Sequence, residues 1–137
     1  MEPVRVLVAD HFAIRRLGYR EVLKQLPEVV VVGEASNGRM ALRVAQKLLP
    51  DVILLEHELP GLNALELLRR LRACGVTSRV LVFGRSTRPA DAEALLRAGA
   101  AGYMHDYDEL DLTLAAIRGV ARGETGWLSP RLAGKPA

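Results

Sequence analysis

Three acidic residues each stand at the end of a short, largely apolar run. Asp10 follows the run Val-Arg-Val-Leu-Val-Ala, Glu56 closes the run Val-Ile-Leu-Leu-Glu, and Asp106 follows Tyr-Met-His. Unbroken apolar runs bounded by turn residues are typical of strands buried on both faces of a parallel sheet. Because ligands bind at the carboxyl ends of parallel strands, we expect these three carboxylates to converge on one site.

Three neighbouring carboxylates cannot all stay charged without a large electrostatic cost, so either one is protonated or a cation joins them. All three histidines, His11, His57 and His105, adjoin these acids, which suggests a transition-metal site. Alternation along a strand points His57 and His105 away from the acids beside them, so we expect only His11 to face the site. One histidine does not make a zinc site, and the sequence does not support that interpretation.

Segments with the apolar periodicity of helices lie between five predicted strands. Apolar residues recur at three- and four-residue spacing between the strands, as from residue 41 to residue 48, and Asn37 and Asn63 stand where helix caps are expected. The predicted strands are 4–9, 29–33, 52–56, 79–83 and 103–105, and the predicted helices are 12–26, 41–48, 64–71, 90–98 and 108–122. The apolar face predicted for the first helix consists of Ile14, Leu17, Gly18, Val22 and Leu26.

The alternation of strands and helices predicts an α/β fold, a doubly wound parallel sheet built as (βα)5. Such a pattern implies right-handed crossovers and helices on both faces of the sheet. At 137 residues the chain is expected to form one domain. Residues 1–122 carry the periodic pattern, whereas residues 123–137 lose it and are predicted to be a C-terminal tail or linker.

The composition limits the cell compartment and the partners. Half of the residues are hydrophobic and only 4% are aromatic, so the core is mainly aliphatic. No apolar run approaches the ~18 residues of a membrane span, so no membrane partner is expected. A single cysteine, Cys74, fits a reducing cytoplasm, which is the predicted location. The net charge of +3 is scattered over several helices, which favours a solvated surface over a phosphate-binding face.

The sequence resembles the response-regulator receiver domains of the NarL/FixJ branch over about residues 4 to 130. The resemblance rests on V-R-V-L-V-A-D-H, on V-V-G-E-A-S-N-G-R-M-A-L, on P-D-V-I-L-L-E-H-E-L-P-G-L-N-A-L-E-L-L-R-R-L-R, on L-R-A-G-A-A-G-Y and on A-I-R-G-V-A-R-G-E. It implies a flavodoxin-like fold with strand order 2-1-3-4-5 and a pocket at the strand ends.

Receivers of this family accept a phosphoryl group on an aspartate at the end of the third strand. Two acids after the first strand help to hold Mg²⁺, and a Thr or Ser and a Lys end the fourth and fifth strands. At these positions the chain has Glu56 as the phosphoacceptor equivalent, Ala9 and Asp10 as the acid pair, Gly84 at the hydroxyl position and Asp106 at the lysine position. The resemblance therefore implies a familiar scaffold with a degenerate phosphorylation site, a pseudo-receiver.

These changes predict that the domain is not usefully phosphorylated. The extra methylene of Glu56 moves the attacking oxygen by ~1.5 Å, and a displacement near 1 Å can cost ~100-fold in rate. Gly84 offers no hydroxyl, and Asp106 places a negative charge where the family has a positive one. Glu56 could imitate phospho-aspartate, but the groups it would draw in are absent, so a fixed or differently triggered state is favoured. The family's aromatic switch position holds Tyr103, whose rotamer is predicted to be set by packing.

Three interpretations of the acid cluster stay open, and no cofactor is certain. In the first, Asp10, Glu56 and, by family analogy, the carbonyl of Glu58 hold a divalent cation such as Mg²⁺. In the second, Arg85 or Arg88 from the adjoining loop folds in and replaces the lost lysine. In the third, the three acids are simply solvated at the rim of the sheet.

The predicted function is regulatory: a receiver that controls a transcriptional output, independently of phosphorylation, through dimerisation or by binding a protein partner or ligand. Receivers of this kind often pair through the last two helices and the fifth strand. Charged residues on this face are the candidates for intersubunit ion pairs, with ordinary surface charge as the alternative: Arg97, Asp108, Asp111, Arg118 and Arg122.

Two alternative functions and one exclusion complete the prediction. The alternatives are a phosphorelay receiver with altered phosphoacceptor chemistry and a ligand-sensing domain in which Ala9 and Gly84 open room at the sheet's end. No nucleophile–base pair or glycine-rich phosphate cradle is evident, so an enzyme is not expected. Family members usually continue into a LuxR-type helix-turn-helix, so DNA contact is expected only through an output domain outside this chain.

Overall fold

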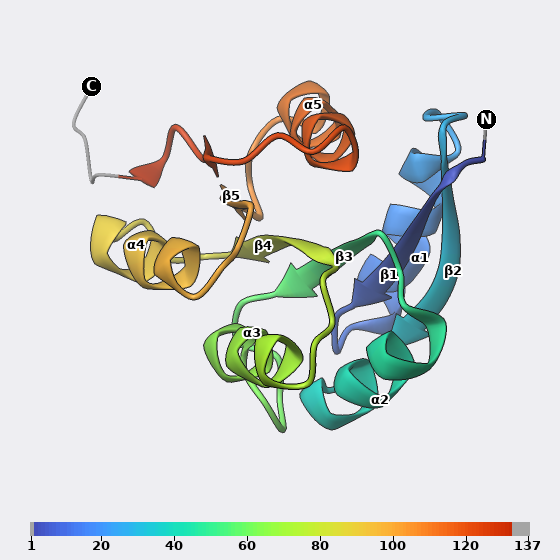
Figure 1. The fold of residues 1–137 in the computed structure, drawn as a ribbon. Helices are drawn as coiled ribbons and strands as arrows, with labels where there is room; N and C mark the ends of the chain where they lie inside the picture. The colour runs from blue at the N-terminus through green and yellow to red at the C-terminus, as the bar shows by residue number, and fades with distance from the viewer. Residues whose placement is uncertain (1, 133–137) are drawn as a thin grey trace.

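The computed structural model, which describes residues 2–132, is a parallel sheet with helices on both faces (Figure 1). The strands are β1 (Val4–Ala9), β2 (Val29–Ala35), β3 (Val52–Glu56), β4 (Arg79–Gly84), β5 (Gly102–His105) and β6 (Trp127–Leu128). The helices are α1 (Ala13–Leu23), α2 (Gly38–Leu48), α3 (Ala64–Ala73), α4 (Pro89–Arg97) and α5 (Leu110–Ala121). The sheet order is β2-β1-β3-β4-β5-β6, so the predicted flavodoxin-like fold is confirmed, with a sixth strand added at one edge.

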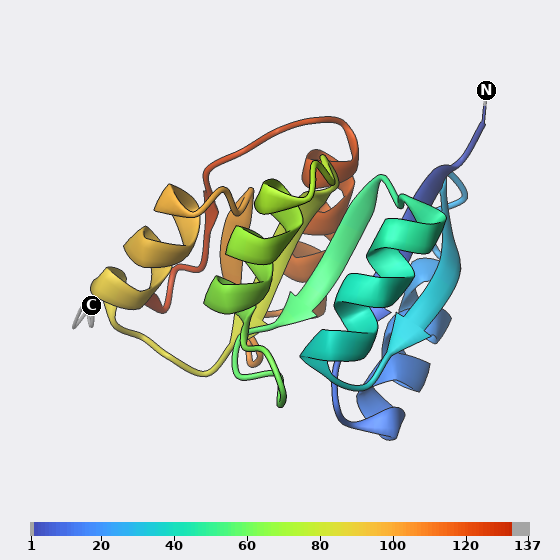
Figure 2. The same cartoon turned by 60° about the horizontal axis from the view of Figure 1, so that its bottom comes forward.

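Two apolar layers hold the helices to the sheet. Leu23 of α1 and Ile117 of α5 belong to one buried cluster, whereas Ala45 of α2, Leu67 of α3 and Leu95 of α4 belong to the other. Figure 2 shows the same division of helices between the two faces. Strand β3 lies in the middle of the sheet and is buried at every residue, which explains its unbroken apolar sequence.

The strand register brings the functional candidates to one edge of the sheet. Glu56 of β3 pairs with Phe83 of β4, and Gly84 pairs with His105 of β5, the residue before Asp106. Strand β1 lies against β3 in parallel and ends one residue before Asp10. The carboxyl ends of β1, β3, β4 and β5 therefore lie side by side, as the sequence predicted.

The helix starts follow the predicted caps. The Asn37 side chain accepts a hydrogen bond from the Met40 amide, and Asn63 forms a reciprocal capping box with Glu66 at the start of α3. Among the residues that the structure describes, no helix is long and apolar enough to cross a membrane.

Helix α1 differs from the prediction in length and in the face that it buries. It ends at Leu23 rather than at residue 26, and Ile14 and Leu17 are 75% and 53% exposed. Of the predicted apolar face only Leu26 is buried. The C-terminal half of the helix packs on the sheet, whereas its first turns border a hollow that faces α5. The predicted core face is therefore wrong for the first half of this helix.

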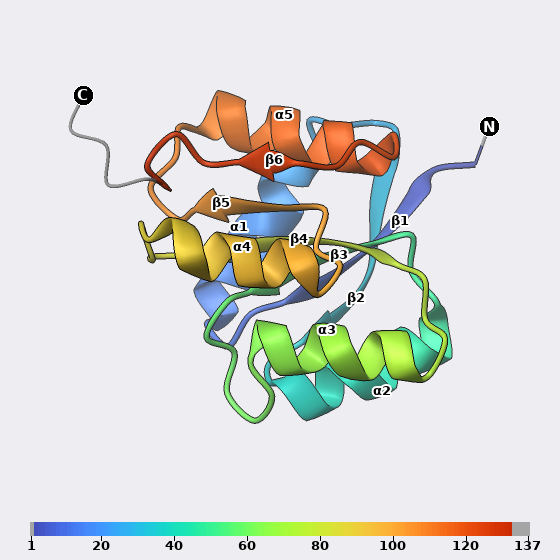
Figure 3. The same ribbon diagram turned by 60° about the vertical axis from the view of Figure 1, so that its left-hand side comes forward.

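The segment after α5 is more ordered than the predicted tail. Strand β6 pairs in parallel with β5, and the Ser129 amide donates to the Tyr103 carbonyl at 2.8 Å (Figure 3). Leu132 is 8% exposed and packs in the same apolar cluster as α4. Residues 123–132 thus complete the edge of the sheet, and residues 133–137 of the predicted tail lie outside the described residues.

Candidate functional site

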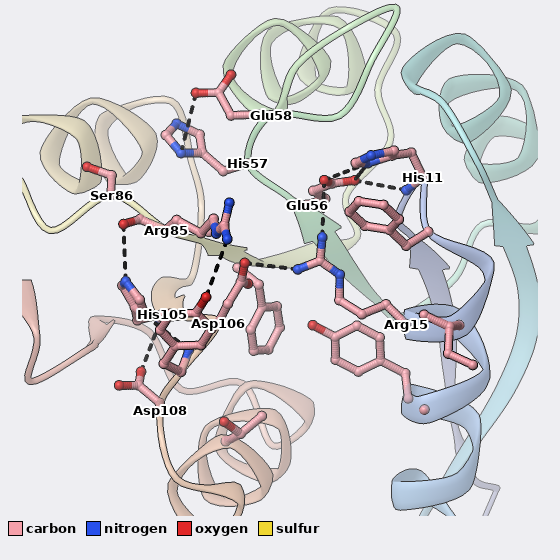
Figure 4. A pocket seen from close by; sticks show the side chains of 18 of the residues that line it. His11, Arg15, Glu56, His57, Glu58, Arg85, Ser86, His105, Asp106 and Asp108 are labelled. Atoms are coloured by element: carbon pink, nitrogen blue, oxygen red, sulfur yellow. Dashed lines mark hydrogen bonds and ion pairs between the residues drawn. The ribbon is translucent and has the colours of Figure 1, made fainter.

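A single arginine joins the three carboxylates that the sequence analysis expected to converge. Arg15 Nε lies 3.0 Å from Asp10 Oδ2, Nη1 lies 2.9 Å from Asp106 Oδ2, and Nη2 lies 3.5 Å from Glu56 Oε2. Figure 4 shows the guanidinium of Arg15 between Glu56 and Asp106. The carboxylates therefore meet around a positive charge that comes from α1.

Arg15 was missed by sequence reasoning, which offered only Arg85 or Arg88 of the loop before α4 as an arginine that could replace the lost lysine. In the structure Arg85 donates to the Tyr107 hydroxyl at 3.3 Å, and Arg88 pairs with Asp91 within its own helix turn. Arg15 reaches the cluster because α1 starts three residues after Asp10, so its first turn stands over the strand ends. The only sequence signal was an arginine five residues after an acid, which is common on solvated helices.

Glu56 is held by His11 as well as by Arg15. Its Oε1 accepts hydrogen bonds from the His11 backbone N–H at 2.8 Å and from His11 Nδ1 at 2.8 Å, and its Oε2 lies 2.7 Å from the same ring nitrogen. With Glu56 ionised, this contact requires the His11 tautomer that carries a proton on Nδ1, because a carboxylate only accepts. Glu56 is 9% exposed, so both oxygens are engaged inside the protein.

Asp10 is the most buried member of the cluster, at 3% exposure. Burial raises the pKa of its carboxyl, and the charge of Glu56 adds to the effect. The hydrogen bond that Oδ1 accepts from the Phe12 amide at 2.8 Å and the charge of Arg15 oppose this rise. The cluster is thus only partly neutralised by its one arginine.

The position that the family resemblance assigns to a hydroxyl is filled by neighbouring side chains. A Cβ placed on Gly84 would lie 2.7 Å from His57 Cβ and 2.9 Å from Tyr103 Oη. Tyr103 is fully buried, and its hydroxyl donates to the Ser86 carbonyl at 2.9 Å. Burial raises the pKa of Tyr103 to about 12. Packing therefore fixes the Tyr103 side chain, and Gly84 opens no free space.

The donor set does not fit Mg²⁺ as it stands. Asp10, His11 and Glu56 present ligand atoms within 4.8 Å of one another, which is close enough for a shared ion. Each carboxylate oxygen of Asp10 and Glu56 is nevertheless engaged by Phe12, His11 or Arg15. Mg²⁺ demands a nearly octahedral set of oxygens and keeps several waters, which the guanidinium leaves no place for.

The side chains of Glu58 and His105, which the sequence analysis considered in connection with a metal site, lie outside the cluster. The Glu58 side chain is 78% exposed and lies 3.9 Å from His57 Nδ1. His105 accepts from the Tyr107 amide through Nδ1, at 3.0 Å, and lies 3.1 Å from the Arg85 carbonyl through Nε2. Of the three histidines, His11 alone hydrogen-bonds a carboxylate of the cluster, that of Glu56, whereas His57 and His105 line the hollow beside it.

A hollow of about 1020 Å³ adjoins the cluster between α1 and α5. Apolar side chains such as Ile14 from α1 and Leu110 from α5 line it together with charged residues, among them Arg15, Glu56 and Asp106 of the cluster. Gly18 also faces it, and a Cβ at this position would meet no atom within 4 Å. The volume lies at the upper end of the range for small-molecule pockets.

The family model of the response regulator receiver domain matches residues 6–117. The chain belongs to this family. The receiver is 37% identical over 123 residues to the nitrate/nitrite response regulator NarL of Escherichia coli K12, which covers 90% of the chain and 57% of that relative. The response regulator GacA of Pseudomonas aeruginosa is 34% identical over 130 residues, covering 95% of the chain and 60% of GacA. The receiver thus spans less than two thirds of these relatives.

Solved structures agree with this assignment. The signal receiver domain of NarL from Mycobacterium tuberculosis superposes with a TM-score of 0.85 at 32% identity, covering 90% of the receiver and 100% of that chain. A LuxR-family two-component response regulator from Aurantimonas superposes with a TM-score of 0.89 at 28% identity, covering 97% and 94%. The receiver is therefore of the NarL/LuxR type.

The face proposed for pairing is partly occupied within the receiver itself. The Asp108 side chain is 1% exposed and accepts from the His105 amide at 2.8 Å and from Ser129 Oγ at 2.9 Å. Arg118 forms a bidentate ion pair with Glu28. The Asp108 side chain is therefore buried rather than exposed as the sequence analysis expected, and Arg118 already has an ion-pair partner in Glu28, the residue before β2. The exposed candidates that remain on this face are Arg97, Asp111 and Arg122.

Proposed function

We propose that this receiver controls a transcriptional output without being phosphorylated, through dimerisation or by binding a partner or ligand. The observation that carries the proposal is the contact of Arg15 with all three carboxylates of the cluster. An incoming phosphoryl group would have to displace Arg15 and His11 from Glu56 before it could react. It would then meet the negative charge of Asp106 and no hydroxyl at Gly84.

The energetics of phosphoryl transfer support the same proposal. Catalysis of this reaction depends on positioning the nucleophile and on cations that neutralise the phosphoryl oxygens. Both oxygens of Glu56 already accept hydrogen bonds inside the protein, and the positive charge of Arg15 is already shared among three acids. The cluster therefore has no unpaired positive charge with which to stabilise the negative phosphoryl oxygens in the transition state.

The C-terminal segment offers the proposed route to an output. The loop after β5 carries Asp106, which binds Arg15, and Asp108, which binds Ser129. Arg131 also donates to the Tyr107 carbonyl at 3.0 Å. The acid cluster and the segment that follows α5 are therefore attached to the same short loop. Since the relatives are longer than this chain, we place the output, including any DNA contact, in a further domain.

Intact-mass measurement after incubation with acetyl phosphate and Mg²⁺ tests the proposal. We expect no mass gain of one phosphoryl group on the wild-type chain or on Glu56→Gln. A stoichiometric gain that is lost in Glu56→Gln would contradict the proposal and establish the alternative, a phosphorelay receiver that uses a glutamyl phosphate.

The route through dimerisation has its own test. The exposed charges of Arg97 and Arg122 make charge reversal informative, with the exposed Arg43 as the control (Arg43→Glu), because α2 packs on β2 at the other edge of the sheet. Analytical ultracentrifugation should show a dimer that Arg97→Glu combined with Arg122→Glu dissociates and Arg43→Glu leaves intact. A monomeric wild type at high concentration would exclude this route.

A ligand-sensing receiver is a second candidate, favoured by the hollow between α1 and α5. Gly18 faces this hollow with open space, so Gly18→Leu would project into it and occupy the part beside α1, whereas Gly18→Ala would hardly change its volume. A thermal-shift screen against metabolites should find a stabilising compound whose effect Gly18→Leu removes and Gly18→Ala keeps. Equal stabilisation of all three proteins would place the ligand elsewhere.

A further inference from the structure

We propose that Arg15 is the resident cation of the carboxylate cluster and that it keeps divalent metal ions out of the site. The inference concerns the cluster on which the proposed function rests, but it depends only on the geometry of Arg15 and not on phosphorylation. In this proposal Arg15 takes the place of both the metal ion and the lysine that the family resemblance implies.

The guanidinium matches the cluster better than a lysine would. Its planar fork presents separate N–H groups, and each of its three nitrogens faces a carboxylate from a different strand end: Asp10, Glu56 and Asp106. The Arg15 side chain is 31% exposed, and its Cζ lies 5.0 Å from the centroid of the Phe12 ring. The aromatic ring and the acids hold the charge in one place.

The same contacts block the atoms that a metal ion needs. Asp10 Oδ2 and Glu56 Oε2 both face Arg15, and the other oxygen of each carboxylate accepts from a backbone amide, Phe12 or His11. An entering dication would meet the positive charge of Arg15 and would have to break these bonds. Repulsion and lost hydrogen bonds act in the same direction, so the ion is excluded.

Removal of the arginine should therefore create a metal site. Asp10, His11 and Glu56 keep their ligand atoms within 4.8 Å of one another, which gives two carboxylates and one imidazole. This mixed set suits Mn²⁺, which accepts both oxygen and imidazole nitrogen, better than it suits Mg²⁺. The cluster also loses its one arginine charge, so its attraction for a dication grows.

The experiment compares Mn²⁺ binding to the wild-type chain and to variants of α1 by isothermal titration. We expect no binding to the wild type at millimolar Mn²⁺ and a gain in affinity of about 10- to 100-fold in Arg15→Ala and Arg15→Gln, the range by which groups around a metal alter its affinity. Arg20→Gln is the matched control, because it removes the same charge from α1 at a side chain that pairs with Glu34. It should behave as the wild type.

Paramagnetic broadening locates the bound ion. In ¹H–¹⁵N spectra of Arg15→Gln, Mn²⁺ should broaden the amide signals of residues 10–12 and 56 first, and the dispersed remainder of the spectrum reports that the variant is folded. Arg15→Gln keeps most of the side-chain stem, so it serves as the second variant should Arg15→Ala unfold. Wild-type binding as tight as that of the variants, or no gain in either variant, would overturn the proposal. Neither outcome involves a phosphodonor, so the proposed function is tested separately.

Discussion

Asp10 is the most deeply buried carboxylate of the cluster. Its carboxyl is buried and lies near Glu56, and burial raises its pKa above 3.8 in the folded state. An acid whose folded-state pKa is raised binds its proton more tightly in the folded chain. Stability is therefore lost as the pH rises from 3.8 through the raised pKa of the folded state, and the loss is complete at neutral pH.

Asp10→Asn should remove this penalty. The amide oxygen can still accept from the Phe12 N–H, and Arg15 keeps Glu56 and Asp106 as partners. At pH 7 we expect the variant to be more stable than the wild type, because it removes the buried charge that raises the pKa of this carboxyl. The difference should vanish below pH 3.8, where Asp10 is protonated in both states. Urea melts at both pH values check this, and a variant that is less stable at pH 7 would contradict it.

Gly84 gives a second prediction at this scale. Gly84→Thr restores the residue type of the family, but its Cβ would lie 2.7 Å from His57 Cβ and 2.9 Å from Tyr103 Oη. We expect a loss of about 1–3 kcal/mol in the free energy of unfolding because the added atoms overpack this site. Gly18→Thr, whose Cβ meets open space, tests whether the clash is the cause, although it adds a β-branched residue to a helix. Unchanged stability of Gly84→Thr would refute the packing of His57 and Tyr103 described above.

Sequence reasoning at the residue scale found the acids and missed their cation. Asp10, Glu56 and Asp106 could be placed together because each ends a strand of one parallel sheet. Arg15 could not, because an arginine in the first turn of a helix has the same sequence pattern whether it points to solvent or folds back over a strand end. Only the start of α1 at Ala13 decides its direction.

At the scale of elements, two helical glycines have opposite roles. A Cβ on Gly119 of α5 would lie 2.5 Å from Trp127 Nε1, whereas a Cβ on Gly18 of α1 meets nothing within 4 Å. The close approach of α5 to the Trp127 ring of β6 is thus possible because position 119 has no side chain.

Alanine substitution should separate these roles. Gly18→Ala should stabilise the receiver by about 0.5–1 kcal/mol, the usual gain of alanine over glycine in a helix. Gly119→Ala should destabilise it by about 1–3 kcal/mol, because the added methyl group displaces the indole ring. Thermal melts give the signs, and emission from the single tryptophan should shift to the red in Gly119→Ala alone. Equal gains in both variants would mean that β6 does not pack on α5.

The helices and strands with strong hydrophobic patterns in the sequence were predicted best. The five main strands were found because buried apolar runs are visible without tertiary information. The predicted inward face of α1 was wrong because Ile14 and Leu17 have core-like spacing, although Ile14 borders the hollow and Leu17 is exposed. Strand β6 has two residues, which is too short for any periodicity, and its pairing with β5 depends on a loop that brings it back to the sheet edge.

At the scale of the whole molecule, the β5–α5 loop connects the acid cluster to the C-terminal segment. Asp106 binds Arg15, and two residues later Asp108 binds Ser129, which follows β6. Arg15→Gln should free Asp106, loosen this loop and shift Trp127 emission to the red, whereas Arg20→Gln should leave it unchanged. Steady-state fluorescence of the folded variants checks the connection. Identical spectra for both variants would show that the cluster and the C-terminal segment are independent.

The central claim is that Arg15 and His11 occupy the cluster so fully that neither a metal ion nor a phosphoryl group enters. Titration of the wild-type chain with beryllofluoride and Mg²⁺, followed by ¹H–¹⁵N NMR, tests this most directly, because the phosphoryl analogue does not depend on the lifetime of an acyl phosphate. We predict no saturable shift for the amides around Glu56, Gly84 and Asp106. Saturable shifts at these three strand ends that require both Mg²⁺ and beryllofluoride would contradict the claim.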